Sequence, residues 1–460
     1  MAKKVIEEST LSAIGNSIRA KTGRTYKIPP LNMPTEIASI QTGGNSSSSV
    51  PPNEVNFYDY DGTVVASYSL EEAQNLTSLP AGPTHGRLTF QGWNYTLEKV
   101  KAFTRPMNVG AIYTTDDGKT RIYITLGEGR TSPLLGCCPN GTVIVDWGDG
   151  TTPDTLTGTS TSTIKYTPTH NYTSPGSYVI SLTVNGTCGF LGGPIDNNHC
   201  YLLKYSTDAN TLNIYYQNAI TKIEFGDGVT IIGDYSFYKC YSLTSVTISN
   251  SVTSIGAATF HSCYSLTSLM IPNSVTTIGD SAFHSCYSLT SITIPDSVSS
   301  IESHIFDSCY SLISITIPDS VTSIGNDTFF KCYSLANLII PDSVTNIRDY
   351  TFYYCYSLTS FTIPNGVTSI GAATFHSCYS LTSITIPDSV TSIGSNTFRY
   401  CYAMAEYHFK SITPPTLSNA NAFSDILSGC IIYVPQGSLN AYKTATNWTA
   451  YAKYMQEETT

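Results

Sequence analysis

Eight cysteines recur at intervals of 23 residues with no insertion or deletion, and a tyrosine follows each of them. Thiols at regular spacing could ligate a metal, form disulfides or act as nucleophiles. A fixed period of this length is typical of a solenoid, in which each repeat forms one coil and equivalent residues stack above one another. The eight cysteines are Cys240, Cys263, Cys286, Cys309, Cys332, Cys355, Cys378 and Cys401.

The tyrosine that follows each cysteine is the first candidate for ligand binding. If the cysteine points into the coil, its neighbour points outward, and coils one strand spacing apart then carry a continuous aromatic stripe. Exposed aromatic rings make good contacts with sugars or proteins. Alternatively, the stacked rings only cover the edge of the coils. The stripe consists of Tyr241, Tyr264, Tyr287, Tyr310, Tyr333, Tyr356, Tyr379 and Tyr402.

Threonines in register on the strands of most coils form the second candidate surface. The alternative is that threonine is simply favoured on exposed strands. Met270 and Ile339 replace this threonine in two coils, and Glu302 and Arg348 replace a glycine in two others; all four are expected to face the surface. The threonines are Thr247, Thr293, Thr316, Thr362 and Thr385.

Catalytic and metal chemistry find little support. His261, His284 and His376 each precede a Ser-Cys pair, but a core-facing cysteine cannot share a metal with an outward histidine. Parallel cysteine side chains keep their Cβ atoms too far apart for disulfides, so reduced buried thiols are expected. Adjacent Cys137 and Cys138 have no evident role.

An enzyme is not expected either. The group Asp146, Asp149 and His170 has no nucleophile at a suitable spacing and is interpreted as structural. No pair of acidic residues suggests a glycan-cleaving site. The sequence therefore predicts a binding protein with neither a cofactor nor a metal.

One repeat, Val275 to Ile294, shows how a coil is built. Its apolar residues are expected to fill the interior, while Leu289 to Pro295 alternates like a half-buried strand that proline ends. Asp296 and Ser297 then form a turn, and the segment from Ile278 to Phe283 returns the chain irregularly. The predicted interior set is Val275, Ile278, Phe283, Cys286, Leu289, Ile292 and Ile294.

Composition narrows the class of protein further. A chain of 460 residues calls for several domains, and only 12% of it is charged, which suits exposed β-structure. A net charge of −10 without basic clusters argues against nucleic acid as a partner. No run of apolar residues is long enough to span a membrane, and the first residues lack the apolar core of a signal peptide.

The repeats from Val229 to about Met404 resemble the BspA-type leucine-rich repeats, a family of surface and adhesion solenoids. Phase, phenylalanine, cysteine and leucine recur together in eight units. The resemblance implies a terminal cap at 405–460, where Phe423 and Cys430 leave the repeat register.

Two modules are expected before the solenoid. The sequences WGDGT (Trp147 to Thr151) and HNYTSPGSYVISLTV (His170 to Val184) resemble the polycystic-kidney-disease (PKD) type of immunoglobulin-like sandwich, which implies that Asp149-Gly150 forms a turn and that Tyr172 and Tyr178 pack on the sandwich.

Glu54 to about Thr104 resembles the small β-grasp-like internalin B-repeat. Asp59 to Gly62 in this module is interpreted as a hairpin turn rather than a calcium loop, because Leu70 stands where the loop needs glutamate.

The first forty residues place Leu11, Ile14 and Ile18 on one face of a short helix, and they resemble tail-associated structural proteins of phages from Gram-positive hosts. Gln41 to Asn53 has the composition of a flexible linker.

The predicted fold is mainly β, a leucine-rich-repeat β-solenoid of eight coils preceded by an immunoglobulin-like sandwich, a small β module and a short helical N-terminus. Its expected parts are an anchor at 1–40, a linker at 41–53, a β-grasp-like module at 54–105, a sandwich at 106–190, an N-terminal solenoid cap at 191–228, repeats at 229–404 and a C-terminal cap at 405–460.

This order predicts a phage or prophage tail protein that recognises a bacterial surface glycan or protein through its repeats. Its N-terminus would contact other tail proteins in the virion, and a homo-oligomer is possible. The absence of a signal peptide favours this hypothesis. A bacterial cell-surface adhesin is the first alternative, and a purely structural virion protein is the second.

Overall fold

The computed structural model describes residues 54–191, 203–204 and 218–458. The chain divides into two compact units. Of the described residues, those within 54–329 and 341–344 belong to the first unit, and those within 330–340 and 345–458 belong to the second. The predicted anchor, the linker and most of the predicted N-terminal solenoid cap lie outside the described residues.

The first unit begins with a module of four strands and two short helices. The sheet order is β2-β1-β4-β3, in which β1 and β4 are parallel and the outer pairs are antiparallel. The strands are β1 (Glu54–Tyr58), β2 (Val64–Ser69), β3 (Leu88–Trp93) and β4 (Asn108–Thr115), and the helices are α2 (Leu70–Gln74) and α3 (Leu97–Lys101). β4 lies in the segment that the sequence assigns to the next domain, so the module extends to Thr115.

Local sequence signals explain both helix starts and the first turn. Ser69 and Glu72 form a reciprocal capping box at α2, and Thr96 caps α3. Asp59 and Gly62 close the β1–β2 hairpin, in which the Gly62 amide donates to the Asp59 carbonyl at 3.0 Å. The predicted hairpin turn is therefore confirmed.

The next strands form a sheet that continues directly into the solenoid. The long strand β6 pairs with β7 and β9, while β8 and β10 pair with its first residues. These strands are β5 (Thr120–Leu126), β6 (Leu134–Asp146), β7 (Asp154–Thr159), β8 (Lys165–Tyr166), β9 (Gly176–Phe190) and β10 (Leu203–Lys204). The immunoglobulin-like assignment of this region stays a prediction.

β5 and β9 also close the first coil of the solenoid. β11 (Ile220–Glu224) runs antiparallel to β5, and β12 (Val229–Ile232) runs parallel to the end of β9. An unpaired strand edge is a site for aggregation. The preceding domain therefore supplies the cap that the repeats need at this end.

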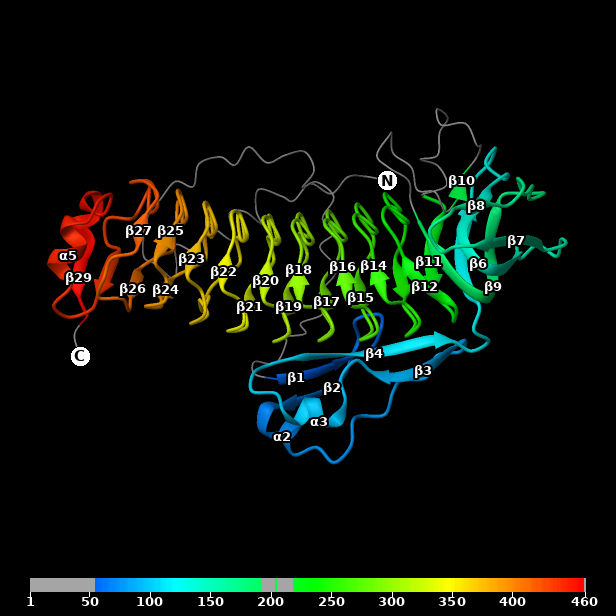
Figure 1. Cartoon of the computed structure of the whole chain (residues 1–460), viewed down its shortest axis with the longest axis horizontal. Helices are drawn as coiled ribbons and strands as arrows, with labels where there is room; N and C mark the ends of the chain where they lie inside the picture. The colour runs from blue at the N-terminus through cyan, green and yellow to red at the C-terminus, as the bar shows by residue number, and fades with distance from the viewer. Residues whose placement is uncertain (1–53, 192–202, 205–217, 459–460) are drawn as a thin grey trace. The chain divides into compact units, whose positions relative to one another are not determined.

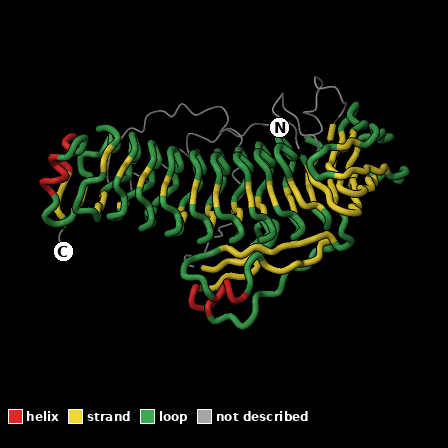
Figure 2. The backbone as a smooth tube through the Cα atoms, in the orientation of Figure 1, coloured by secondary structure: helices red, strands yellow, loops and turns green. Residues whose placement is uncertain are grey.

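Each following coil of the first unit adds two short parallel strands, one to each side of the coil (Figures 1 and 2). One series follows β11 and the other follows β12. The first series is β13 (Ser245–Thr247), β15 (Ser268–Met270), β17 (Ser291–Thr293) and β19 (Ser314–Thr316), and the second is β14 (Ser254–Ile255), β16 (Thr277–Ile278), β18 (Ser300–Ile301) and β20 (Ser323–Ile324).

The coil interior is built as the sequence predicts. All seven residues of the predicted interior set are buried, and the phenylalanines stack, with Phe260, Phe283 and Phe306 at centroid distances of 5.8 Å. Each cysteine lies below this stack. The Cys286 Sγ donates to the Phe260 carbonyl of the previous coil at 3.2 Å, and the same bond recurs at Cys378 and Cys401.

In five coils a buried threonine before the phenylalanine also helps to join coils, a role that sequence reasoning missed. The Thr397 hydroxyl lies 3.0 Å from the Gly371 carbonyl of the previous coil and 2.8 Å from the Gly394 carbonyl of its own. Equivalent threonines are fully buried at Thr259, Thr328, Thr351 and Thr374. Their constant position before the phenylalanine was the available signal.

The second unit continues the same coil pattern and ends in a cap. Trp448, Tyr442 and Tyr451 are buried against Phe409 and Phe423, which closes the last coil with aromatic rings. Its elements are β21 (Asn337–Ile339), β22 (Asn346–Ile347), β23 (Ser369–Ile370), β24 (Ser383–Ile386), β25 (Ser392–Ile393), β26 (Glu406–Phe409), β27 (Thr416–Leu417), β28 (Ile431–Val434), α5 (Leu439–Thr444), the 3₁₀ helix η2 (Thr449–Tyr454) and β29 (Met455–Glu457).

The predicted fold class is confirmed: the protein is mainly β, contains a β-solenoid and has few short helices. Within the described ranges, the helices are too short to serve as transmembrane spans.

Candidate binding surfaces

The tyrosines that follow the cysteines form a stacked column in each unit. In the first unit, neighbouring rings from Tyr241 to Tyr310 lie 4.7, 4.3 and 4.6 Å apart. In the second unit, rings from Tyr333 to Tyr402 lie 4.8, 4.7 and 5.4 Å apart. All six ring pairs lie within 20° of parallel, so the rings cover one another's faces.

The stacking determines what the tyrosine column can offer a ligand. Seven of the rings are half-buried, whereas Tyr310 is buried with 2% of its surface exposed. Burial raises the pKa of Tyr241 and of Tyr379 to about 12, which keeps both hydroxyls protonated at neutral pH. The column therefore presents ring edges and neutral hydroxyls. Its role in ligand binding stays a prediction.

The strand-face threonines fall into two groups. Thr362 and Thr385, in the second unit, are exposed. Thr247, Thr293 and Thr316, in the first unit, are buried with 3%, 1% and 7% of their surfaces exposed. The N-terminal module lies over these buried residues, because β4 contacts β13, β15 and β17 in turn.

Ion pairs and hydrogen bonds hold the N-terminal module on the strand face of the first unit. Lys99 pairs with Asp296 at 2.9 Å, and Arg105 reaches both the Asp319 carboxylate at 2.8 Å and the Ile317 carbonyl at 2.5 Å. The Asn108 amide donates to the Thr316 hydroxyl at 3.3 Å. Asp296 and Asp319 occupy equivalent positions in successive coils, so the spacing of Lys99 and Arg105 in the module matches the spacing of the coils.

Met270, on the strand face, makes an apolar contact with the module. Its side chain packs with Tyr58 and Ile112 and is 4% exposed. Gly110 of β4 passes so close that an added Cβ would lie within 3.0 Å of the Met270 Sδ. The prediction that Met270 faces solvent is therefore wrong, because the module covers it. Ile339, the other replacement, is 42% exposed.

The histidines before the cysteines lie along the coil edge rather than in a metal site. His261 and His284 stack at 4.4 Å, and burial lowers the pKa of His261 to about 3, so it is neutral at physiological pH. His284 and His304 each place Nδ1 3.5 Å from the same Asp307 oxygen. In the parts of the chain that the structure covers, no group of three or more ligating side chains could hold a metal.

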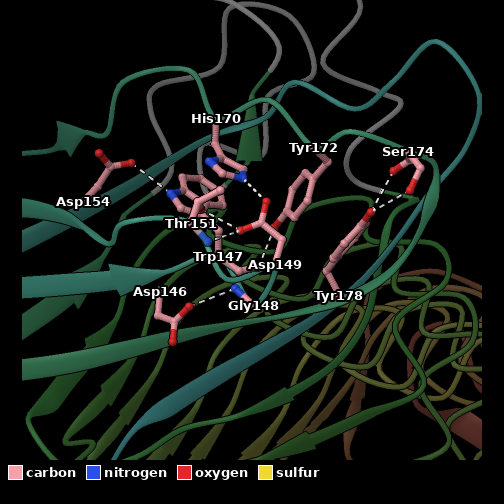
Figure 3. A network of polar contacts seen from close by, with 10 residues as sticks. All are labelled: Asp146, Trp147, Gly148, Asp149, Thr151, Asp154, His170, Tyr172, Ser174 and Tyr178. Atoms are coloured by element: carbon pink, nitrogen blue, oxygen red, sulfur yellow. Dashed lines mark hydrogen bonds and ion pairs between the residues drawn. The ribbon is translucent and has the colours of Figure 1, made fainter.

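The WGDGT and HNY sequences form a compact polar network between β6 and β9 (Figure 3). His170 stacks on Trp147 at 4.5 Å and lies 2.8 Å from Asp149, while the Tyr172 hydroxyl donates to the Trp147 carbonyl. Burial opposes ionisation of Asp149, but hydrogen bonds from Thr151 and His170 outweigh it and hold its pKa below the ordinary value.

This network holds a turn in place. Asp149-Gly150 connects β6 to β7, as predicted, and Gly148 and Gly150 adopt φ of 77° and 81°, which glycine tolerates. Each residue drawn in Figure 3 makes a polar contact within the network. The arrangement fits the structural interpretation of Asp146, Asp149 and His170.

Sequence reasoning overlooked one group of residues at the coil edge. Tyr350, Tyr353, Tyr354 and Tyr400 stand one to five residues before a cysteine of the second unit. Tyr353 stacks on Phe330, and Tyr350 and Tyr354 both contact Tyr353. Comparing the coils position by position would have found them, because the other coils have smaller or charged residues at most of these positions.

Residues 211–336 and 322–432 match the family described as BspA type leucine-rich repeat region, with six copies. The coil geometry agrees with this match. The repeat region is therefore similar to BspA-type leucine-rich repeats over just under half of the chain.

Solved structures with similarity to this chain include a cell surface protein. A leucine-rich cell surface protein from Faecalibacterium prausnitzii is 32% identical, and the match covers 41% of this chain and 59% of that protein, with a TM-score of 0.30. A leucine-rich repeat protein of T. pallidum is 28% identical over 36% of this chain and 65% of its own, with a TM-score of 0.25.

The pneumococcal vaccine antigen PcpA is 17% identical over 52% of this chain and 73% of its own, with a TM-score of 0.36. A comparison with curated proteins finds no match.

Proposed function

We propose that this protein recognises a ligand on a bacterial surface through the outer edge of its BspA-like solenoid. The tyrosine column carries the proposal, since both units hold rings in register with their edges and hydroxyls outward. Tyrosine contributes a rigid, amphipathic contact surface at little cost in conformational entropy. The similarity of the repeats to BspA-type repeats and to a cell surface protein supports a repeat-based adhesin.

The carrier of this binding function is proposed to be a phage or prophage tail. The resemblance of the first forty residues to phage tail-associated proteins supports this assignment, with the N-terminus contacting other tail proteins. A bacterial cell-surface adhesin is the alternative, and the name of the Faecalibacterium relative, a cell surface protein, favours it. Either carrier would present the same solenoid, with no enzymatic step.

Binding of the fluorescently labelled full chain to intact Gram-positive cells tests the function. Replacing Tyr356 and Tyr379 by serine is expected to reduce binding, while unchanged circular dichroism shows that the coils remain folded. The matched control replaces the exposed strand-face residues Thr362 and Thr385 by alanine. Loss of binding only in this control would move recognition from the tyrosine column to the strand face.

Absence of binding by the wild-type chain to every host tested would refute the recognition function and favour a structural role in the virion. Immunogold electron microscopy with an antibody against the chain distinguishes the carriers. Label on tails of induced phage particles supports the tail protein, whereas label on the cell envelope alone supports the adhesin.

A further inference from the structure

The coils differ from one another mainly along one line of positions on their edge. The residues Cys-Tyr-Ser-Leu recur in all but the last coil, whereas the two residues before the cysteine form six different pairs in the eight coils. A surface that repeats identically cannot favour one coil over another. A ligand that binds one part of the solenoid in preference to the rest must therefore contact positions that vary. The varying pairs are Tyr238-Lys239, His261-Ser262, His284-Ser285, Asp307-Ser308, Phe330-Lys331, Tyr353-Tyr354, His376-Ser377 and Arg399-Tyr400.

Aromatic residues gather at and near these positions in the second unit. Tyr353 stacks between Phe330 and His376, with centroid distances of 5.0 and 4.4 Å. Tyr354 meets Tyr353 edge-on at 4.3 Å, and Tyr350 lies 5.6 Å from Tyr353 with its plane tilted by 58°. We call Phe330, Tyr350, Tyr353, Tyr354 and Tyr400 the aromatic ridge.

Several of these tyrosines occupy positions whose backbone conformation disfavours bulky residues. Tyr350, Tyr354 and Tyr400 have φ of 56°, 63° and 60°, a left-handed conformation that disfavours bulky residues. Asn396 and Asp327 hold the position of Tyr350 in other coils at nearly the same φ. These smaller residues adopt the conformation more readily, so the coil itself does not require tyrosine. Strained residues retained on a surface point to function.

Among the tyrosines that the structure describes, the most exposed one belongs to the ridge. Tyr350 is 41% exposed, and the other members of the ridge are half-buried. Tyr400 carries the Arg399 guanidinium over its ring at 4.5 Å and accepts a hydrogen bond from it at 2.7 Å. Tyrosine and arginine are the residues most enriched in the energetic centres of protein interfaces.

The local charge is opposite to that of the whole chain. Lys331, Arg348 and Arg399 lie on or beside the ridge, against the two carboxylates Asp349 and Asp425, which leaves one positive charge. Both carboxylates are engaged, since Asp349 accepts the Ala372 amide at 2.6 Å and Asp425 pairs with Arg399 at 3.0 Å. The chain as a whole carries −10. An acidic partner is therefore attracted to this part of the solenoid.

We infer that the aromatic ridge is the specificity-determining contact for a protein, one that presents an acidic patch on the recognised cell surface. The inference rests on the proposed recognition function and names the partner class and the subsite. A protein fits the ridge better than a glycan does. Sugars gain most from stacking on open aromatic faces, and both faces of Tyr353 are already covered by Phe330 and His376. Ring edges and hydroxyls suit protein side chains.

The experiment uses the full chain and intact Gram-positive cells that bind the wild type. The ridge variant carries Tyr350→Ser, Tyr354→Ser and Tyr400→Ser, which also relieve the strained conformations. The matched control carries Tyr235→Ser and Tyr238→Ser in the first unit. Tyr235 has the same φ as Tyr350, 56°, and its ring lies 5.7 Å from that of Tyr238, close to the 5.6 Å between Tyr350 and Tyr353. Thermal unfolding of each variant confirms that the coils are intact.

We expect the ridge variant to bind at least about tenfold more weakly, and the control to bind like the wild type. Treating the cells with proteinase K should abolish wild-type binding, whereas periodate oxidation of glycans should leave it unchanged. Wild-type affinity in the ridge variant, together with loss in the Tyr356 and Tyr379 variant, would overturn the ridge while leaving the proposed function intact. Binding that is sensitive to periodate and resistant to protease would overturn the protein partner in favour of a glycan.

Discussion

Gly110→Ala tests how the N-terminal module is held on the strand face. A Cβ at this position would lie within 3.0 Å of the Met270 Sδ and 3.3 Å from the Thr293 hydroxyl. The backbone at Gly110 does not adopt a positive φ, so alanine is compatible with β4 itself. The substitution therefore strains only the contact between module and solenoid. Overpacking of this kind costs about 1–3 kcal/mol.

Hydrogen exchange at the Asn108 backbone amide measures this loss of free energy. The Asn108 amide donates to the Thr316 hydroxyl across the contact, so its exchange requires the module to separate. A loss of about 1–3 kcal/mol accelerates that exchange about 5- to 150-fold. The Ala102 amide, bonded to the Glu98 carbonyl within α3, serves as the internal control and should not change.

A second substitution should reverse the effect. Met270→Thr restores the residue that most other coils carry and removes the atom that the new Cβ would meet. The double variant is expected to recover most of the protection at Asn108. Unchanged exchange at Asn108 in the single variant would refute the docked arrangement. Equal acceleration at Ala102 would instead show that the module had unfolded.

Three further predictions concern the solenoid. Phe283→Ala removes a fully buried ring from the phenylalanine stack, and the free energy of unfolding in urea should fall by about 3–5 kcal/mol. Burial lowers the pKa of His376 to about 4, below its usual 6.5, so between these pH values only the unfolded chain takes up a proton. The free energy of unfolding should therefore fall by roughly 3 kcal/mol from pH 7 to pH 4. Urea midpoints measure this fall, which should be smaller in His376→Gln. A chain that lacks residues 51–190 leaves the edges of β11 and β12 unpaired and should self-associate in light scattering, whereas a monomer would show that the solenoid caps itself.

Most of the fold could be predicted from the repeat sequence, because each coil has the same pattern of apolar residues and turns. Phe283, Cys286 and Leu289 recur in phase, so their burial followed from the period alone. The hairpin at Asp59 and the turn at Asp149 followed from their glycines. These features depend on a few neighbouring residues, which is why pattern reasoning reached them.

Contacts between distant segments were out of reach of the same reasoning. Nothing in the pattern around Met270 shows that Gly110 lies against it, since the two residues are joined only by tertiary packing. The pairing of β5 with β11 likewise links segments about a hundred residues apart. The strand-face threonines were therefore assigned a single environment, although those of the first unit are covered and those of the second are exposed.

Met270 distinguishes one coil of a nearly uniform array, and the N-terminal module packs on this coil. Recombination between near-identical repeats gains or loses blocks of 23 residues, and the hydrogen bonds at each junction between coils are alike. A block of 23 residues gained after Asp319 leaves the contacts of the module intact. A block lost between Ser268 and Asp319 removes part of the surface on which the module packs. Natural length variation in this lineage is therefore expected beyond the module, with purifying selection on the coils beneath it.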